Sequence, residues 1–162
     1  MADLNIRPAT PADVPLILQF IRELANYEKE LDKAVATPEQ LHEALFCEHP
    51  TVFSVICERG SEAAGFALYF FNFSTWEGKH GLFLEDLYVT PAHRGSGAGK
   101  ALLQHLARTA VARDCARFEW NVLDWNTPAI EFYEAFGAKP QSEWIGYRLS
   151  GDALAAFAGN AD

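Results

Sequence analysis

The chain has 162 residues, of which 49% are hydrophobic and 22% charged, and this composition is that of one compact soluble domain. Its formal net charge of −9 excludes nucleic acid as the main partner and suits a cationic ligand. No apolar run is long enough to span a membrane, and the N-terminus has no signal-peptide pattern, so a cytoplasmic protein without a membrane partner is expected. The cysteines and histidines have no metal-ligand spacing, and we expect no metal.

The first half of the chain predicts a short strand, two helices and then three strands. A short strand is expected at residues 6–8. Two helix starts follow at 10–13 and 37–40, where threonine, proline and an acidic residue suit the positive end of a helix. Apolar residues then recur at helical spacing. The β-rich segments that predict the three strands are 51–57, 65–73 and 81–89.

The second half alternates helices and strands. A helix with an apolar stripe at 102–111 precedes a strand at 116–122, and a further helix begins at Asn126 and ends at Gly137. A last strand is expected at 144–149 and a short helix at 151–158. This order predicts a single α+β domain over 1–162, with one mixed sheet flanked by helices.

The segment RGSGAGKALL at 94–103 is typical of a turn that binds phosphate. A Walker A loop would need glycine at Arg94 and a hydroxyl residue at Ala101, so it does not fit. The dinucleotide pattern fails as well, because its third glycine would fall on Lys100 or Leu102. The pattern R-x-x-G-x-G between a strand and a helix does fit, and backbone N–H groups there can bind an anion. On the glycines alone, a flexible turn that caps a helix is an equal alternative.

A second segment, N-x-x-A-x-x-F-Y-x-x-x-G at 126–137, completes a known order of motifs. The order is a strand, R-x-x-G-x-G, a helix, a second strand and then this segment. It resembles the order in the GNAT superfamily of acetyl-CoA-dependent N-acetyltransferases, and the resemblance covers nearly the whole chain. The resemblance implies a GNAT-like fold, a glycine turn that holds the CoA pyrophosphate, and a bulge in the preceding strand whose backbone pairs with the pantetheine arm. The cofactor-binding residues that it implies are Leu87, Tyr88, Val89, Arg94, Gly95, Ser96, Gly97, Ala98, Gly99, Lys100 and Asn126. Lys100 is expected to be an auxiliary charge whose side chain can point to solvent.

A narrower resemblance concerns the acceptor. The segments IRPATPADVPLILQFIRELANYEKE, FLEDLYV and NTPAIEFYEAFGA resemble the spermidine/spermine acetyltransferase branch, which includes enzymes acting on thialysine. This resemblance implies a small primary amine as substrate and a homodimer. The substrate-binding residues that it implies are Tyr27, Glu28, Glu85 and Asp86. Trp76, in the loop before the carboxylate strand, is also expected at the amine site, because its ring can face a cation.

The chemistry of amine acetylation agrees with these residues. An alkyl amine with a pKa of about 10.4 is protonated at neutral pH and cannot attack a thioester until a base removes the proton. Consecutive strand residues point to opposite faces, so only one of Glu85 and Asp86 is expected to face the amine. The family resemblance favours Glu85 as the base. The GNAT resemblance implies a tyrosine near the CoA sulfur, so Tyr133 is the expected acid for the leaving thiolate, in a direct attack within a ternary complex. The alternatives are a solvated Glu85, a core Tyr133 and a Trp76 that covers the core.

The sequence therefore predicts an N-acetyltransferase for a polyamine, a diamine or an aminoalkyl amino acid. Two other functions remain open. One is a protein lysine or N-terminal acetyltransferase, and the other is a non-catalytic acyl-CoA-binding module, against which the presence of both Glu85 and Tyr133 argues.

Overall fold

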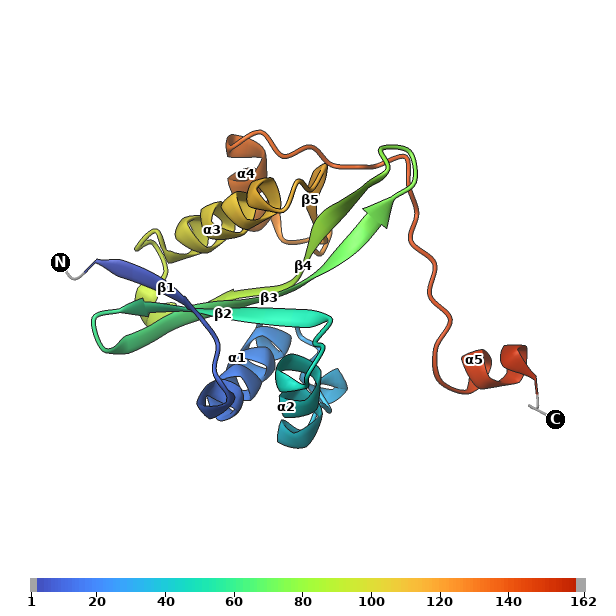
Figure 1. Cartoon of the computed structure of the whole chain (residues 1–162), viewed down its shortest axis with the longest axis horizontal. Helices are drawn as coiled ribbons and strands as arrows, with labels where there is room; N and C mark the ends of the chain where they lie inside the picture. The colour runs from blue at the N-terminus through green and yellow to red at the C-terminus, as the bar shows by residue number, and fades with distance from the viewer. Residues whose placement is uncertain (1–2, 160–162) are drawn as a thin grey trace. The chain divides into compact units, whose positions relative to one another are not determined.

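A mixed five-stranded sheet forms the centre of the first of two compact units. The structure is a computed structural model that describes residues 3–159, and it divides into Met1–Leu123 and Asp124–Asp162. The strand order is the chain order, with antiparallel pairing up to the fourth strand and parallel pairing of the fifth (Figure 1). The strands are β1 (Leu4–Pro8), β2 (Val52–Arg59), β3 (Glu62–Ser74), β4 (Lys79–Val89) and β5 (Arg117–Trp120).

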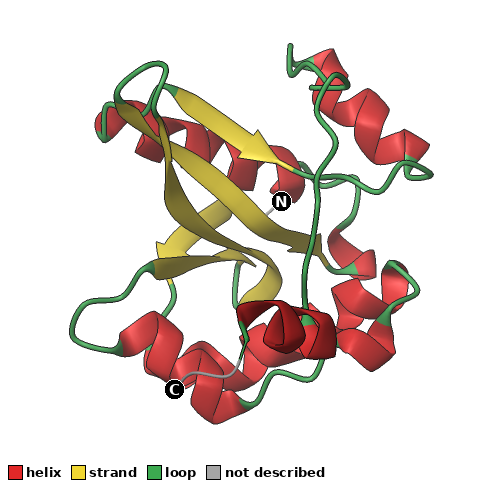
Figure 2. Cartoon of the chain, turned by 90° about the vertical axis from the view of Figure 1, so that its right-hand side faces the viewer, coloured by secondary structure: helices red, strands yellow, loops and turns green. Residues whose placement is uncertain are grey.

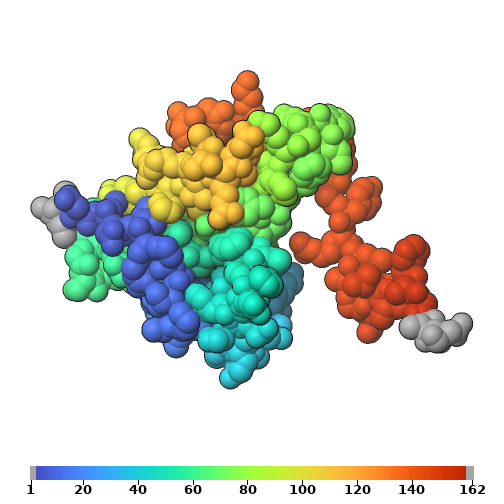
Figure 3. Space-filling view, viewed as in Figure 1, coloured from blue at the N-terminus to red at the C-terminus, as the bar shows by residue number. Residues whose placement is uncertain are grey.

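Helices cover both faces of this sheet. On one face lie α1 (Val14–Tyr27) and α2 (Pro38–Phe46), whose surfaces adjoin in the space-filling view (Figure 3), and on the other lies α3 (Ala98–Ala112) (Figures 1 and 2). Short 3-10 turns occupy η1 (Pro11–Asp13), η2 (Leu31–Lys33) and η3 (Pro91–His93). The core between α1, α2 and the sheet contains Val14, Ile17, Phe20, Leu41, Leu45, Ile56, Phe66, Leu68 and Tyr88. The predicted mixed sheet flanked by helices is confirmed.

Both predicted helix starts are confirmed, and each is stabilised by its own side chains. The Thr37 hydroxyl accepts a hydrogen bond from the Gln40 N–H at 3.2 Å, and the Gln40 side chain accepts one from the Thr37 N–H at 3.0 Å. At the first start, the Thr10 N–H donates to Asp13 at 2.7 Å. Arg7 donates to both oxygens of the same carboxylate, at 2.7 and 2.9 Å, and this pairing lowers the pKa of Asp13 to about 2.

The second unit contains two helices. They are α4 (Thr127–Ala135) and α5 (Gly151–Ala158). Gly137 follows α4 with a φ of 97°, which is the left-handed conformation expected of the glycine that ends a helix. Among residues 3–159, no helix is both long enough and apolar enough to cross a membrane.

The strand predicted at 144–149 is wrong. These residues belong to no helix or strand, and the described chain forms no sixth strand in its sheet. The prediction rested on the β-forming residues Trp144, Ile145 and Tyr147, whose side chains are all exposed. Such residues favour a pleated, half-buried surface, and a strand forms only where a neighbouring strand supplies hydrogen-bond partners. The predicted strand at 116–122 is also shorter than expected, since β5 ends at Trp120.

Candidate active site

A bulge interrupts β4 at the position predicted to carry the catalytic carboxylate. Leu84 lies opposite Tyr69 of β3, whereas Asp86 lies opposite Leu68. Leu68 and Tyr69 are adjacent on β3, whereas their partners on β4 are two positions apart. Glu85, which lies between these partners, is therefore the extra residue of the bulge. This confirms the bulge expected in the strand before the glycine turn. Because a bulge changes the direction of the side chains around it, the strict alternation of Glu85 and Asp86 does not hold here.

The Asp86 carboxyl at this bulge is affected by burial and by two other carboxyl groups. Asp86 lies opposite the core residue Leu68 and is half-buried, whereas Glu85 is exposed. Burial, together with the negative charges of Glu85 and Glu28, raises the pKa of Asp86 to about 6. Glu28 caps the C-terminal end of α1, and burial raises the pKa of its carboxyl as well. A carboxyl group that titrates near pH 6 can both hold a cation and exchange a proton close to neutrality.

The backbone of β4 is open on one edge beyond the bulge. The parallel ladder between β4 and β5 ends at Leu84 and Trp120 in the described chain, whereas pairing with β3 continues to Val89. Residues 85–89 therefore turn N–H and C=O groups toward an edge with no strand beside it. Such an edge can pair with an extended molecule that carries amide groups.

The glycine turn joins this open edge to the first turn of α3. Gly95 and Gly97 have φ angles of 75° and 88°, which disfavour any residue with a Cβ atom, and Gly97 is the N-cap of α3. The first N–H groups of a helix have no partner within it and attract anions. The Ser96 hydroxyl is buried and has no hydrogen-bond partner within residues 3–159, while Arg59 donates to the Ser96 carbonyl at 3.1 Å. Arg59 thus holds the turn in place, and the turn carries N–H and O–H groups of the kind that bind anions.

Comparisons with known proteins show the family to which this chain belongs. Residues 18–138 match the acetyltransferase (GNAT) family. The chain belongs to that family. It is an N-acetyltransferase of the GNAT type, in agreement with the resemblance of its sequence motifs.

Two relatives and one solved structure indicate its place among GNAT proteins. A thialysine N-epsilon-acetyltransferase of Sus scrofa is 37% identical over 170 residues, with 98% of this chain and 99% of the relative covered. A spermidine/spermine N(1)-acetyltransferase-like protein of Homo sapiens is 36% identical over 90% of this chain and 22% of its own length. An integron cassette protein from V. cholerae superposes with a TM-score of 0.81 at 29% identity, over 99% of both chains. These relatives agree with the resemblance of the sequence to the spermidine/spermine branch, which includes enzymes acting on thialysine.

The three cofactor residues predicted on β4 lie within the sheet, and the side chain of Tyr88 is already engaged. Leu87, Tyr88 and Val89 all lie in the ladder with β3. The Tyr88 side chain is buried, and its hydroxyl donates to Glu23 at 2.7 Å. Burial, together with the hydrogen bond to Glu23 and its charge, raises the pKa of Tyr88 to about 12, so this hydroxyl keeps its proton. Tyr88 can therefore meet a cofactor through its backbone only.

Two basic residues of the glycine turn have different surroundings. The Arg94 Nε donates to the Val89 carbonyl at 3.3 Å, and its guanidinium carbon lies 5.3 Å from the centre of the Tyr27 ring. Lys100 is exposed in the first turn of α3, as expected for an auxiliary charge. Tyr27, predicted from the sequence for the amine, is thus in contact with a residue predicted for the cofactor.

The remaining predicted site residues lie in a hairpin and in the second unit. Trp76 lies in the turn between β3 and β4 and is 81% exposed, so it does not cover the core. Asn126 is the N-cap of α4. Tyr133 lies on α4 beside two other aromatic rings, with its ring centre 5.7 Å from that of Phe132 and 6.3 Å from that of Phe136.

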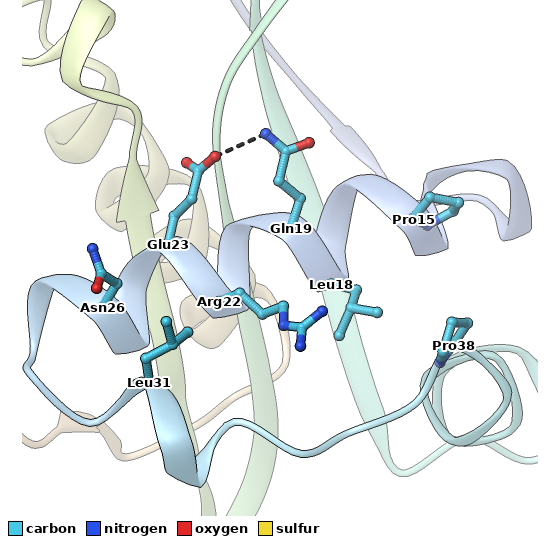
Figure 4. Close-up of a pocket in the computed structure, with 8 residues that line it drawn as sticks. All are labelled: Pro15, Leu18, Gln19, Arg22, Glu23, Asn26, Leu31 and Pro38. Carbon is cyan, nitrogen blue, oxygen red and sulfur yellow. Dashed lines mark hydrogen bonds between the residues drawn. The ribbon is translucent and has the colours of Figure 1, made fainter.

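Glu23 and Arg59 are two residues that sequence reasoning missed. Glu23 lies one helical turn before Tyr27 and lines a hollow of 610 Å³ along α1, where it also accepts a hydrogen bond from Gln19 at 2.8 Å (Figure 4). The four-residue spacing between Glu23 and Tyr27 is the only sequence signal that points to Glu23. Nothing in the sequence pairs Arg59 with a turn 37 residues away. Within the described residues, no cluster of three potential ligands is arranged to hold a metal ion.

Proposed function

We propose that this GNAT enzyme transfers an acetyl group from acetyl-CoA to a primary amine of a small cationic substrate. The substrate class is a polyamine, a diamine or an aminoalkyl amino acid such as thialysine. The observation that carries the proposal is the set of three carboxyl groups, Glu28, Glu85 and Asp86, at the bulge of β4. A group of negative charges there favours an acceptor that is itself positively charged.

The residues around the turn fit acetyl-CoA. The unsatisfied Ser96 hydroxyl, the N-terminal N–H groups of α3 and Arg94 supply donors for a pyrophosphate. The open edge at 85–89 supplies backbone groups for the amides of the pantetheine arm. Leu87, Tyr88 and Val89 would act through their backbone, residues 94–100 through the turn, and Asn126 from the start of α4. Acetyl-CoA supplies the thioester that is attacked.

The reaction is a direct attack within a ternary complex. The amine arrives as an ammonium ion, attracted by the carboxylates, and Glu85 removes its proton directly or through a water molecule. The amine nitrogen then bonds to the acetyl carbon as the carbon–sulfur bond breaks. Tyr133 donates its proton to the leaving thiolate. Tyr27, Glu28, Trp76 and Asp86 complete the amine site, where an aromatic ring can face a cation.

We further propose that residues 1–162 act as one acetyltransferase domain, and that the protein is a cytoplasmic homodimer. The family match across 18–138 supports the single domain. The resemblance to the spermidine/spermine branch supports the dimer.

Turnover against a panel of amines tests the proposed function. Released thiol is measured with acetyl-CoA and a polyamine, a diamine, thialysine, a lysine peptide and a peptide with a free α-amine. We expect turnover with the small amines and none with the peptides. Turnover with peptides alone would identify a protein acetyltransferase, and acetyl-CoA binding without any turnover would identify a non-catalytic binding module.

Tyr133→Phe is the companion variant that tests the chemistry. It removes the O–H while keeping the ring among Phe132 and Phe136. We expect kcat to fall by about a hundredfold or more at saturating substrates, the range for a lost general acid. Tyr147→Phe is the matched control, because Tyr147 is an exposed tyrosine of the same unit. An unchanged kcat in Tyr133→Phe would rule out the proposed acid.

A further inference from the structure

The end of α1 and the glycine turn meet at Arg94. Arg94 directly precedes Gly95, and its guanidinium carbon lies 5.3 Å from the centre of the Tyr27 ring. Its Nε also donates to the Val89 carbonyl at 3.3 Å. Contact between a guanidinium group and a tyrosine ring within about 6 Å is attractive. A side chain of the turn is therefore held by two fixed groups, one from β4 and one from α1.

A hydrogen-bonded pair beside this contact fixes the neighbouring part of α1. The Tyr88 hydroxyl donates to Glu23 at 2.7 Å, and Gln19 donates to the other oxygen of Glu23 at 2.8 Å. The positive charge of Arg94 acts on the Tyr88 hydroxyl, so the guanidinium group lies close to this pair. Glu23 and Tyr27 are four residues apart and so lie on the same side of α1. The buried Tyr88 thereby joins α1 to β4 next to the Arg94–Tyr27 contact.

Arg94 uses part of its hydrogen-bonding edge for the Val89 carbonyl and the Tyr88 hydroxyl. A guanidinium group has five N–H donors, so further donors remain for an anion. A guanidinium group is planar, and it meets an aromatic ring with its face while its N–H groups point outward in the plane. An exposed arginine must otherwise give up side-chain freedom when it binds an anion, and this loss weakens binding. An arginine that is already held over a ring loses less.

We propose that Tyr27 is a positioning residue for the cofactor: its ring holds Arg94 in place for the pyrophosphate of CoA. This inference rests on the proposed function, because it takes Arg94 as a pyrophosphate ligand. It adds a role to Tyr27, which the sequence assigns to the amine. One side chain at the end of α1 then serves both substrates.

Binding of CoA in the absence of any amine tests this role. The dissociation constant of CoA is measured by titration calorimetry for the unsubstituted chain and for Tyr27→Leu and Tyr27→Phe. We expect Tyr27→Leu to weaken CoA binding about two- to fivefold, the range for one exposed cation–π contact. Tyr27→Phe keeps the ring and should bind CoA as the wild type does. Phe73→Leu is the matched control, because it removes an exposed ring from the tip of the β3–β4 hairpin.

A double-mutant cycle separates positioning from a general change in α1. In an Arg94→Met background, Tyr27→Leu should have no further effect on CoA binding, since the side chain that it positions is absent. An effect of equal size in both backgrounds would overturn the inference, as would a Tyr27→Leu variant with wild-type affinity. A Tyr27→Phe variant as weak as Tyr27→Leu would overturn it too, because the hydroxyl would then be responsible.

The outcome for the wild type separates this inference from the proposed function. If the wild type does not bind CoA, both are wrong. If it binds CoA and Tyr27→Leu is unchanged, only the positioning role is wrong. If Tyr27→Leu weakens CoA binding although no small amine is acetylated, the positioning role holds and the amine substrate is wrong.

Discussion

At the scale of single residues, Glu85 and Asp86 show how two adjacent carboxyl groups acquire different properties. Glu85 is the extra residue of a bulge and is exposed, whereas Asp86 returns to the ladder opposite Leu68 and is half-buried. Burial favours the neutral form of a carboxyl, which is why the pKa of Asp86 rises to about 6. The exposed Glu85 is accessible to an arriving amine. The half-buried Asp86 carries a negative charge only above about pH 6.

Substitution of Asp86 should remove a pH dependence from amine binding. In the wild type, Asp86 loses its negative charge as the pH falls through about 6, so the KM for the amine should rise there. Asp86→Asn should raise this KM about fivefold at about pH 8, because losing one attractive charge pair costs about 1 kcal/mol. It should also remove the rise in KM near pH 6. Initial rates across this pH range measure both. Glu85→Gln is the matched variant, because it changes the neighbouring carboxyl group. It should lower kcat, and the loss should be greatest at low pH, where the amine is hardest to deprotonate.

Thermal unfolding provides a second measurement of Asp86 that does not depend on activity. Its pKa is above the ordinary value of 3.8, so the folded state binds this proton more tightly than the unfolded state does. The resulting penalty to stability is absent below about pH 4 and complete above about pH 6. Asp86→Asn should therefore gain in Tm relative to the wild type as the pH rises through this interval. A Tm difference that does not change with pH would contradict the assignment.

At the scale of elements, the glycine turn depends on backbone conformation more than on side chains. Gly97 has a φ of 88° at the N-cap of α3, while Gly99 is already within the helix. An added Cβ atom at Gly99 would lie 3.7 Å from Val89, which is an ordinary contact. The two glycines of one short motif therefore have different requirements.

Two alanine substitutions should shift stability in opposite directions. Gly97→Ala forces a residue with a Cβ atom into the left-handed region and should lower the free energy of unfolding by about 1–2 kcal/mol. Gly99→Ala relieves the flexibility of glycine within a helix and should raise it by up to about 1 kcal/mol. Urea unfolding of the two variants measures both values. Equal losses in both would show that the turn is sensitive to any added atom rather than to the φ angle of Gly97.

At the scale of the whole molecule, charge and assembly are the properties that bear on function. The net charge of −9 is compatible with a cationic acceptor, and the carboxyl groups at the β4 bulge place part of that negative charge at the proposed amine site. In the second unit, several large apolar side chains are exposed, among them Trp144, Ile145 and Tyr147. Exposed groups of this kind are common where a protein contacts a partner.

The proposed homodimer can be measured directly. Sedimentation equilibrium should give a mass of twice the 18.0 kDa of one chain. Substitution of Trp144 and Ile145 by serine should reduce this mass if the exposed segment contributes to the contact between copies. A mass of 18.0 kDa for the wild type at micromolar concentration would contradict the dimer.

The sequence by itself determined the family, the order of helices and strands up to Trp120, and the place of the glycine turn before α3. These features depend on local spacing, such as the threonine–proline helix starts and the R-x-x-G-x-G pattern, which residues close along the chain can specify. Only the tertiary structure decided that Glu85 is the bulge residue, that burial raises the pKa of Asp86, and that Tyr27 contacts Arg94. It also decided that 144–149 forms no strand in the described chain. The physical reason is that strand register, burial and side-chain contact depend on partners far away in the sequence, such as Leu68 for Asp86 and α1 for Arg94.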